Sequence, residues 1–214
     1  MTTQTDSARD RILRIAAQLF VDLGFKGTTI RRLCDAAQVN VSMVNYYFHS
    51  KEDLYHAAVA YAREQEIKGP EESALASGKV KPEEQLRQFI ERFLMNLLLQ
   101  GPHSMLTKLI TRELVEPSGA IQDIITNDIL PQHRHLAVLV RAIAGEGLSD
   151  EAVQQCIFSI IGQALIYVHN RPINELIAPS IRYDEAGIRH IADHIHRFTL
   201  GALKHQRKLT YSKA

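Results

Sequence analysis

Two short helical segments separated by very few residues constrain this fold more than any other feature. In TTIRRLCDAAQVNVSMVNYYF, residues 28–48, Thr28 is expected to cap one helix with its hydroxyl, and that helix should end near Ala37. Asn40, among the better N-cap residues, is expected to open the next helix, which runs to about Tyr47. Because about three residues remain between the two helices, the pattern predicts a helix-turn-helix over about 28–48.

The rest of the chain also shows helical periodicity and has no alternating strand pattern. One helix is expected from Ser7 to Gly24 and another from Ser50 onward. Further helices are expected over 83–100, 102–116, 118–143, 149–170 and 184–207, separated by Gly and Pro. A boundary is expected at 70–82, where Gly, Pro, Ser and Glu collect. The sequence therefore predicts an all-α protein with an N-terminal domain over 8–68 and a C-terminal helical domain over 83–210.

Charge and cysteine content narrow the classes of function. The chain has 25 Lys and Arg against 24 Asp and Glu, so a surface that binds nucleic acid must be a local one. We find no run of about 18 apolar residues and no apolar signal-peptide core, and expect a cytoplasmic protein without a membrane partner. Cys34 and Cys156 are far apart in sequence and lack nearby zinc-ligand spacing, so we expect reduced core cysteines, no metal and no cofactor.

The second short helix should have two different faces. At 100° per residue, Val44 and Phe48 share one side, and Ser42, Asn45 and Tyr46 point another way, with Met43 and Tyr47 on the flank. A recognition helix needs an apolar side that packs and a polar side that enters the major groove. The alternative is that the tyrosines only cover the core of a small three-helix unit.

The stretch TTIRRLCDAAQVNVSMVNYYFHSKEDL resembles the DNA-binding unit of the TetR family of bacterial transcriptional regulators, and the resemblance covers residues 8 to about 60. The positions that fit the family pattern are Thr28, Thr29, Leu33, Ala37, Val39, Asn40, Val44, Tyr46, Phe48, Lys51 and Leu54. Three residues depart from it: Cys34 replaces an alanine, Gln38 a turn glycine and Asn45 a frequent aromatic. A left-handed Gln38 would cost about 1 kcal/mol, unless the turn differs from that of the family.

The resemblance implies specific DNA contacts. Phosphate contacts are expected from Thr28, Thr29, Tyr47 and Lys51, and base contacts from Ser42, Met43 and Asn45, with Val41 near a thymine methyl. The Asn45 amide can bond an adenine edge. Asn40, Tyr46, Arg31 and His49 complete the predicted DNA-binding set, although exposed basic residues are often only solvated.

The C-terminal helices are expected to form a homodimer interface and an effector-binding bundle. One helix-turn-helix covers a half-site, so two copies are needed, and TetR relatives dimerise through their last two long helices. The alternative for the first of these helices is an ordinary central helix buried within one subunit. The predicted interface residues are Ile157, Ile160, Ile161, Gly162, Ala164, Leu165, Val168, Ile191, Ile195 and Phe198. The C-terminal part also resembles the CecR-type subgroup over about 105–135. Candidate contacts to a small-molecule effector are Arg112, Glu113, Tyr167, His169 and Asn170. For Arg112 and Glu113 the alternatives are an internal salt bridge or an exposed helix face.

These patterns favour a transcriptional regulator, most often a repressor in this family, that binds a palindromic double-stranded operator as a homodimer and is released by an effector. Two alternatives stay open: a helical protein-interaction module, or a small-molecule enzyme that uses the ten histidines and many acids. We find no nucleophile elbow, phosphate loop, HExxH or CxxC, so no enzyme is expected. His190 and His194 have i, i+4 spacing, but an amphipathic surface explains them better than a metal site.

Overall fold

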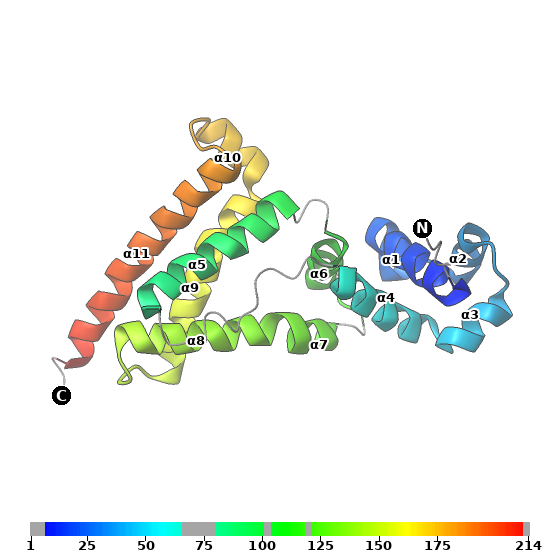
Figure 1. The fold of residues 1–214 in the computed structure, drawn as a ribbon, viewed down its shortest axis with the longest axis horizontal. Coiled ribbons are helices and arrows are strands. Elements are labelled where there is room, and N and C mark those ends of the chain that lie inside the picture. Colours follow the sequence, from blue (N-terminus) through cyan, green and yellow to red (C-terminus); the bar gives the residue numbers. More distant parts are fainter. Residues whose placement is uncertain (1–6, 66–79, 101–103, 119–120, 212–214) are drawn as a thin grey trace. The chain divides into compact units, whose positions relative to one another are not determined.

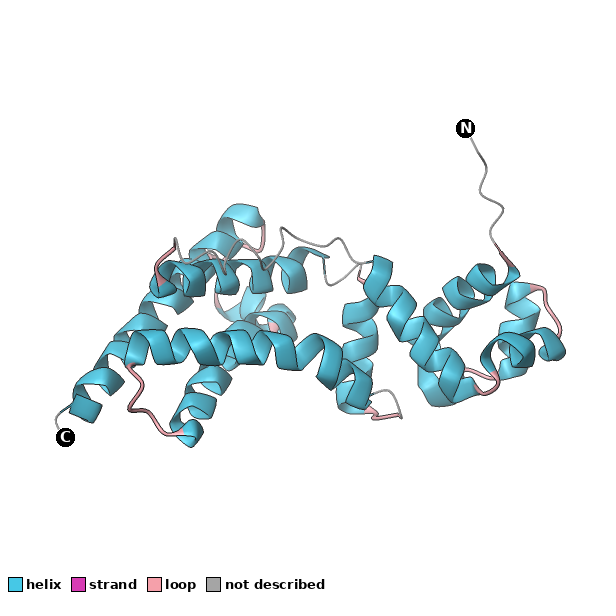
Figure 2. Cartoon of the chain, turned by 60° about the horizontal axis from the view of Figure 1, so that its bottom comes forward, coloured by secondary structure: helices cyan, strands magenta, loops and turns pink. Residues whose placement is uncertain are grey.

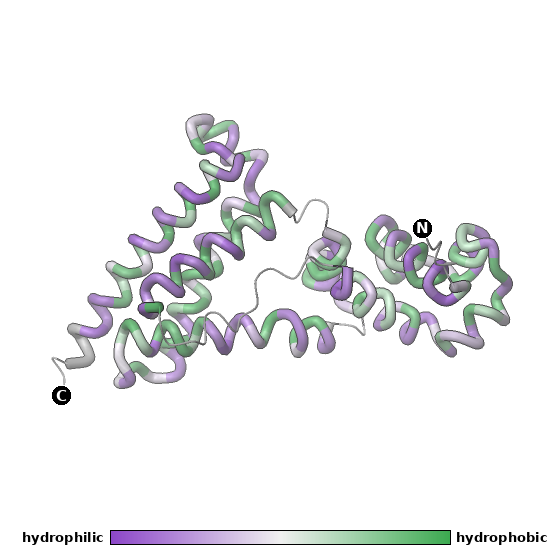
Figure 3. Tube along the Cα trace, viewed as in Figure 1, coloured by the Kyte–Doolittle hydropathy of each residue, from purple (hydrophilic) through white to green (hydrophobic). Residues whose placement is uncertain are grey.

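The computed structural model describes residues 7–65, 80–100, 104–118 and 121–211. These residues form helices joined by turns and loops, and no strand occurs among them, which confirms the predicted all-α class (Figure 2). Hydrophobic and hydrophilic residues alternate in bands along the helices, as expected for elements that bury one side (Figure 3).

The chain divides into two compact units, and the helices of each unit can be followed by their labels in Figure 1. Unit 1 consists of residues 1–68 and 103–128, and unit 2 of residues 69–102 and 129–214. The segment 103–128 follows the expected boundary at 70–82 in sequence, yet its contacts are with the N-terminal helices. Unit 1 is therefore discontinuous in sequence.

Unit 1 has one hydrophobic core that joins its two sequence segments. Its helices are α1 (Ala8–Gly27), α2 (Ile30–Ala37), α3 (Val41–Phe48), α4 (Lys51–Gln65), α6 (Met105–Val115) and α7 (Ile121–Ile124). The π-helical segment η3 (Ile125–Ile129) follows α7. From the N-terminal segment the core takes residues such as Ile12, Phe20, Leu33, Val44 and Leu54, and from the later segment Leu106, Leu109 and Ile124.

The helix starts in unit 1 follow from capping side chains. Ser7, Asn40 and Ser104 each accept a hydrogen bond from the backbone N–H three residues later, as N-caps do. At α2 the prediction was one residue off, because Thr29 rather than Thr28 caps this helix and accepts from the Arg32 N–H. Gln38 ends α2 in the left-handed conformation, with φ 52° and ψ 50°. The turn therefore keeps a left-handed residue without glycine, at a cost of about 1 kcal/mol.

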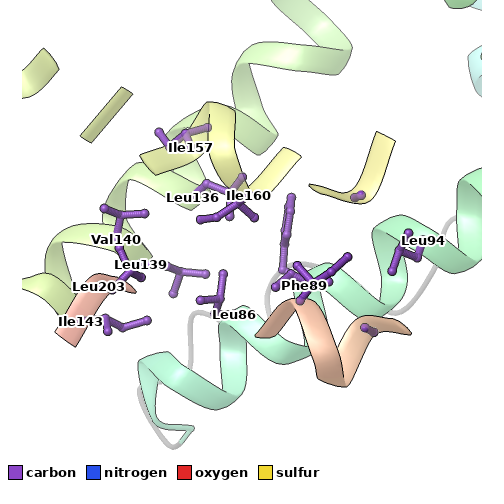
Figure 4. Packing of buried hydrophobic residues seen from close by; sticks show 14 of the residues in the cluster. Leu86, Phe89, Leu94, Leu136, Leu139, Val140, Ile143, Ile157, Ile160 and Leu203 are labelled. Atoms are coloured by element: carbon purple, nitrogen blue, oxygen red, sulfur yellow. The ribbon is translucent and has the colours of Figure 1, made fainter. Parts of the chain in front are cut away.

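Unit 2 packs around a second core. Its helices are α5 (Pro82–Met95), α8 (Leu130–Ala144), α9 (Asp150–His169), α10 (Arg171–Ile177) and α11 (Glu185–Tyr211), and the π-helical η2 (Asn96–Gln100) follows α5. Figure 4 shows side chains from α5, α8, α9 and α11 converging, among them Leu86 and Phe89 of α5, Leu136 and Leu139 of α8, and Ile157 and Ile160 of α9. Helix α10 was not predicted from the sequence. Pro172 lies in its first turn, where a missing N–H leaves no helical hydrogen bond unmade.

Candidate nucleic-acid interface

Helices α2 and α3 form the helix-turn-helix that the sequence predicted. The turn between them is short, and the Val39 N–H closes the end of α2 by donating to the Cys34 carbonyl at 3.0 Å. The Asn40 Oδ1 atom then accepts from the Met43 N–H at 2.8 Å, which satisfies one of the donors that a helix start leaves free. Local hydrogen bonds and the shared core thus hold α3 at a defined angle to α2.

Helix α3 has the two faces expected of a recognition helix. Val44 is 1% exposed and Phe48 is buried, and both belong to the unit 1 core. On the opposite face Tyr46 is 75% exposed, and Ser42 and Asn45 are exposed with it. This face offers hydroxyls and an amide, the groups that bond phosphate oxygens and base edges. It is an exposed polar surface, as the DNA-reading interpretation requires.

Other predicted DNA-binding residues lie in different surroundings. Val41, Tyr47 and His49 are exposed on or next to α3, and Thr29 and Arg31 are exposed at the start of α2. Met43 is only partly exposed because it packs against the unit 1 core. The Lys51 ammonium lies 4.3 Å from the centroid of the Phe25 ring, a cation–π geometry that restrains it beside α3.

Thr28 does not have the predicted phosphate-binding role. Its side chain is 1% exposed, and its hydroxyl lies within hydrogen-bonding distance of two carbonyl oxygens, at 3.1 Å from Leu19 and 2.8 Å from Gly24. A hydroxyl has one proton to donate, and here it points into the protein. The family pattern placed a threonine at this position but did not show which way it faces.

The predicted effector-binding residues Arg112 and Glu113 lie on α6 in unit 1, and protein groups engage both. The Arg112 Nε and Nη2 atoms donate to the carbonyls of Val21 and Asp22, each at 2.8 Å. Glu113 is 1% exposed and accepts from the Tyr55 hydroxyl at 2.8 Å, as well as from Ser118. The structure therefore gives these two residues an internal role instead of a place in the C-terminal bundle.

The other predicted effector contacts lie near the end of α9 in unit 2. Tyr167 is partly buried, and burial raises the pKa of its phenol, with a smaller contribution from nearby Tyr183. His169 is exposed, and Asn170 ends the helix with its backbone N–H bonded to the Ile166 carbonyl. Their role in binding an effector stays a prediction.

The predicted interface residues separate into two groups. Half of them are buried in the core of their own unit and cannot meet a partner: Ile157, Ile160, Ala164, Ile191 and Ile195. Ile161, Leu165 and Val168 are partly exposed, and Gly162 and Phe198 are exposed. Assigning the buried group to an interface was wrong, because α9 is apolar on several faces and periodicity does not show which face turns inward.

An exposed apolar face of α9 and α11 was only partly predicted. Phe158 is 67% exposed, Ile166 is exposed on α9, and Phe198 is 65% exposed on α11. A Cβ placed on Gly162 or Gly201 would meet no atom of the described residues within 4 Å, apart from the backbone of its own helix. The i, i+4, i+8 spacing of 158, 162 and 166 is the signal that identifies this face in the sequence.

Helix α9 is also long and apolar enough to cross a membrane by length and composition, and 22% of its most apolar window is buried. Among the described residues, no group of three or more His, Cys, Asp or Glu is placed to hold a metal ion. Cys34 and Cys156 are both free thiols.

Comparisons with known proteins agree with this geometry. Residues 12–58 match the family model described as bacterial regulatory proteins, tetR family, and residues 82–203 match that of the HTH-type transcriptional dual regulator CecR, C-terminal domain. The CecR regulator of Shigella flexneri is 30% identical over 175 residues, which is 78% of each chain. The probable HTH-type transcriptional regulator YttP of Bacillus subtilis is 31% identical over 126 residues, 59% of each chain.

Solved structures show the same fold at lower identity. The hemolysin II transcriptional regulator HlyIIR has a TM-score of 0.58 and 20% identity, over 88% of this chain and 97% of that chain. A TetR transcriptional regulator from Agrobacterium tumefaciens has a TM-score of 0.59 and 19% identity, over 89% and 93% of the two chains. The matched relatives are regulators of transcription and not enzymes. This chain belongs to the TetR family of transcriptional regulators and has a CecR-type C-terminal domain.

Proposed function

We propose that this regulator binds a palindromic operator as a homodimer, acts mainly as a repressor, and is released from DNA by a small-molecule effector bound in unit 2. The observation that carries the operator proposal is the exposed face of α3, where Ser42, Asn45 and Tyr46 stand opposite the buried Val44 and Phe48. As a protein that acts on chromosomal DNA, it would work in the cytoplasm.

The base-reading part of the proposal depends on Asn45. An amide that bonds an adenine edge bidentately contributes about 1–3 kcal/mol of discrimination, so Asn45→Ala should lower specific affinity roughly tenfold or more. Asn96→Ala is the matched control, because Asn96 is an exposed asparagine in unit 2. Duplexes of roughly 30 base pairs, long enough for two half-sites one turn apart, are first selected by the wild-type protein from a randomised library.

Gel retardation of the selected duplex then tests operator binding. We expect specific retardation that weakens as salt rises, because phosphate contacts release counterions. The selected sequences should also show two inverted half-sites. Failure of the wild-type protein to enrich any sequence would exclude operator recognition, and enrichment of a single unrepeated site would exclude the palindromic mode.

The homodimer is supported by the apolar face of α9 and α11. Phe158 and Phe198 expose about two-thirds of their area in the isolated chain, and the open space at Gly162 and Gly201 permits close helix approach. Large apolar side chains exposed on neighbouring helices are typical of an interaction surface. A closed dimer would present two copies of α3 to one operator.

Sedimentation velocity of the double variant Phe158→Glu/Phe198→Glu tests this interface. The variant should be monomeric at concentrations where the wild type is a dimer, because each glutamate would bury a charge between the subunits. Leu114→Glu, an exposed leucine in unit 1, is the control and should remain dimeric. A monomeric wild type, or a double variant that dimerises normally, would contradict the proposal.

The repressor role is supported by relatives named as repressors, KstR2 of Mycolicibacterium smegmatis and NicS of Pseudomonas putida, whereas CecR is named a dual regulator.

An effector that shifts the protein almost completely off its operator must bind the DNA-incompetent state more tightly than the DNA-competent state by about 5 kcal/mol. Compounds that raise the melting temperature of the protein are titrated into the operator complex. Unchanged operator affinity with every such compound would remove the effector part of the proposal.

A further inference from the structure

Helix α1 leaves helical geometry at Gly24, shortly before the helix-turn-helix begins. Gly24 has φ 74° and ψ 173°, a conformation available almost only to glycine. A helix that ends in this way leaves its last carbonyls without intrahelical donors. The carbonyls of Val21 and Asp22, just before the break, both accept from Arg112 at 2.8 Å. Arg112 therefore caps the part of α1 that precedes the Gly24 break, from 90 residues away in sequence.

The break at Gly24 also sets where α2 begins. The Gly24 carbonyl lies 2.8 Å from the Thr28 hydroxyl, and the Thr28 N–H donates to the same carbonyl at 3.2 Å. Thr29, the next residue, caps α2. Arg112 also touches this point, because a Cβ built on Gly24 would lie 2.7 Å from its Nη1 atom. A continuous set of contacts thus runs from the Arg112 side chain to the first turn of the helix-turn-helix.

Two further contacts hold the 104–128 segment on the N-terminal helices. The buried Tyr55 hydroxyl on α4 donates to Glu113 at 2.8 Å, and Ser118 donates to the same carboxylate. Near the end of α4, Arg63 pairs with Asp128 at 2.7 Å and with Asp123 at 3.3 Å. These contacts keep α6 in place, so that the guanidinium group of Arg112 reaches the two α1 carbonyls in a fixed position.

We propose that Arg112 is a positioning residue for operator binding: by capping α1 at the Gly24 break, it holds α2 and α3 in the orientation that reads DNA. In this role Arg112 does not contact DNA; it raises the fraction of molecules in which α2 and α3 are correctly placed. Apparent affinity falls in proportion to that fraction. The inference rests on the proposed operator binding, and it makes α6 a part of the DNA-reading unit.

The test compares full-length variants on the duplex selected by the wild-type protein and on an unselected duplex of equal length. Arg112→Ala should lower affinity for the selected duplex at least tenfold, while affinity for the unselected duplex changes less than about twofold, because the phosphate-contacting residues remain. Arg112→Lys keeps the charge but lacks the planar pair of donors that bonds two carbonyls. Its affinity for the selected duplex should lie between those of Arg112→Ala and wild type.

The matched control is Arg141→Ala in unit 2. Arg141 also donates to a backbone carbonyl, that of Leu148 at 3.0 Å, and it pairs with Asp150. This variant should lose thermal stability yet bind the selected duplex within about twofold of wild type, as expected for a distant site. All affinities are measured well below each melting midpoint and corrected for the fraction of folded protein. If Arg112→Ala does not fold, Arg112→Lys carries the comparison.

The outcomes separate the two proposals. A wild-type protein that enriches no sequence contradicts operator binding and the Arg112 role with it. A wild-type protein that selects an operator, together with Arg112 variants that bind it as tightly as wild type, overturns only the positioning role. Equal losses on the selected and unselected duplexes would also overturn it, since they would show a general loss of folded protein or of phosphate contacts.

Discussion

Removal of one buried hydroxyl, in Tyr55→Phe, tests the contact that joins α4 to α6. The Tyr55 hydroxyl donates to the Glu113 Oε1 atom at 2.8 Å, and both residues are almost fully buried. The ring packs edge-on against Phe20, with centroids 4.7 Å apart, and lies 5.2 Å from Phe25. Phenylalanine retains these ring contacts, so the substitution isolates the hydrogen bond.

The expected loss follows from the partners that remain. A hydrogen bond to a charged group contributes about 1.5–3 kcal/mol to stability. After the substitution, the Glu113 carboxylate still accepts from the Ser118 hydroxyl at 2.6 Å and from the Ser118 N–H at 2.9 Å. The carboxylate is not left without donors, which places the loss in the lower part of that range, about 1.5–2 kcal/mol.

Urea denaturation of the full-length variants measures this loss as a change in the free energy of unfolding. Tyr61→Phe is the control, because Tyr61 lies on the same helix, is partly exposed, and makes no hydrogen bond within the described part of the chain; this variant should be near neutral. In a Glu113→Leu background, Tyr55→Phe should be neutral or stabilising, since the hydroxyl there has lost its acceptor. A Tyr55→Phe variant within about 0.5 kcal/mol of wild type would refute the buried hydrogen bond.

Three further predictions concern the same unit. Gly24→Ala should lose about 1–3 kcal/mol in urea denaturation, because φ 74° is unfavourable for alanine and the new Cβ meets Arg112; an unchanged midpoint would contradict the break. Asn40→Ala should lose about 0.5–2 kcal/mol through the lost α3 cap, whereas Asn40→Asp should retain most of it, and equal losses would exclude capping. Burial, and then the hydrogen bond to Glu113, raise the pKa of Tyr55. The folded state therefore holds this proton more tightly, so stability is complete below about pH 10 and falls as pH rises further. Tyr55→Phe should reduce that alkaline loss in urea denaturation series, and identical pH profiles would show that Tyr55 does not contribute.

Local sequence was enough to predict most of the helices and the two faces of α3, because these depend on interactions between near neighbours. Capping by Asn40 acts over three residues, and the burial of Val44 and Phe48 follows from their i, i+4 spacing. The same reasoning failed at α10, where a proline in the first turn was interpreted as a break.

The orientation of whole helices and the partners of polar side chains were decided only by tertiary structure. Thr28 fits a DNA-binding pattern, yet its hydroxyl bonds inside the protein, and Ile157 belongs to a core and not to an interface. Arg112 meets its carbonyl acceptors about 90 residues away. Spacing along one helix shows which residues share a face, but which face is buried depends on other segments that pack against it. The sequence by itself thus determined an all-α TetR-type regulator, whereas long-range packing decided that α6 belongs to the same compact unit as α2 and α3.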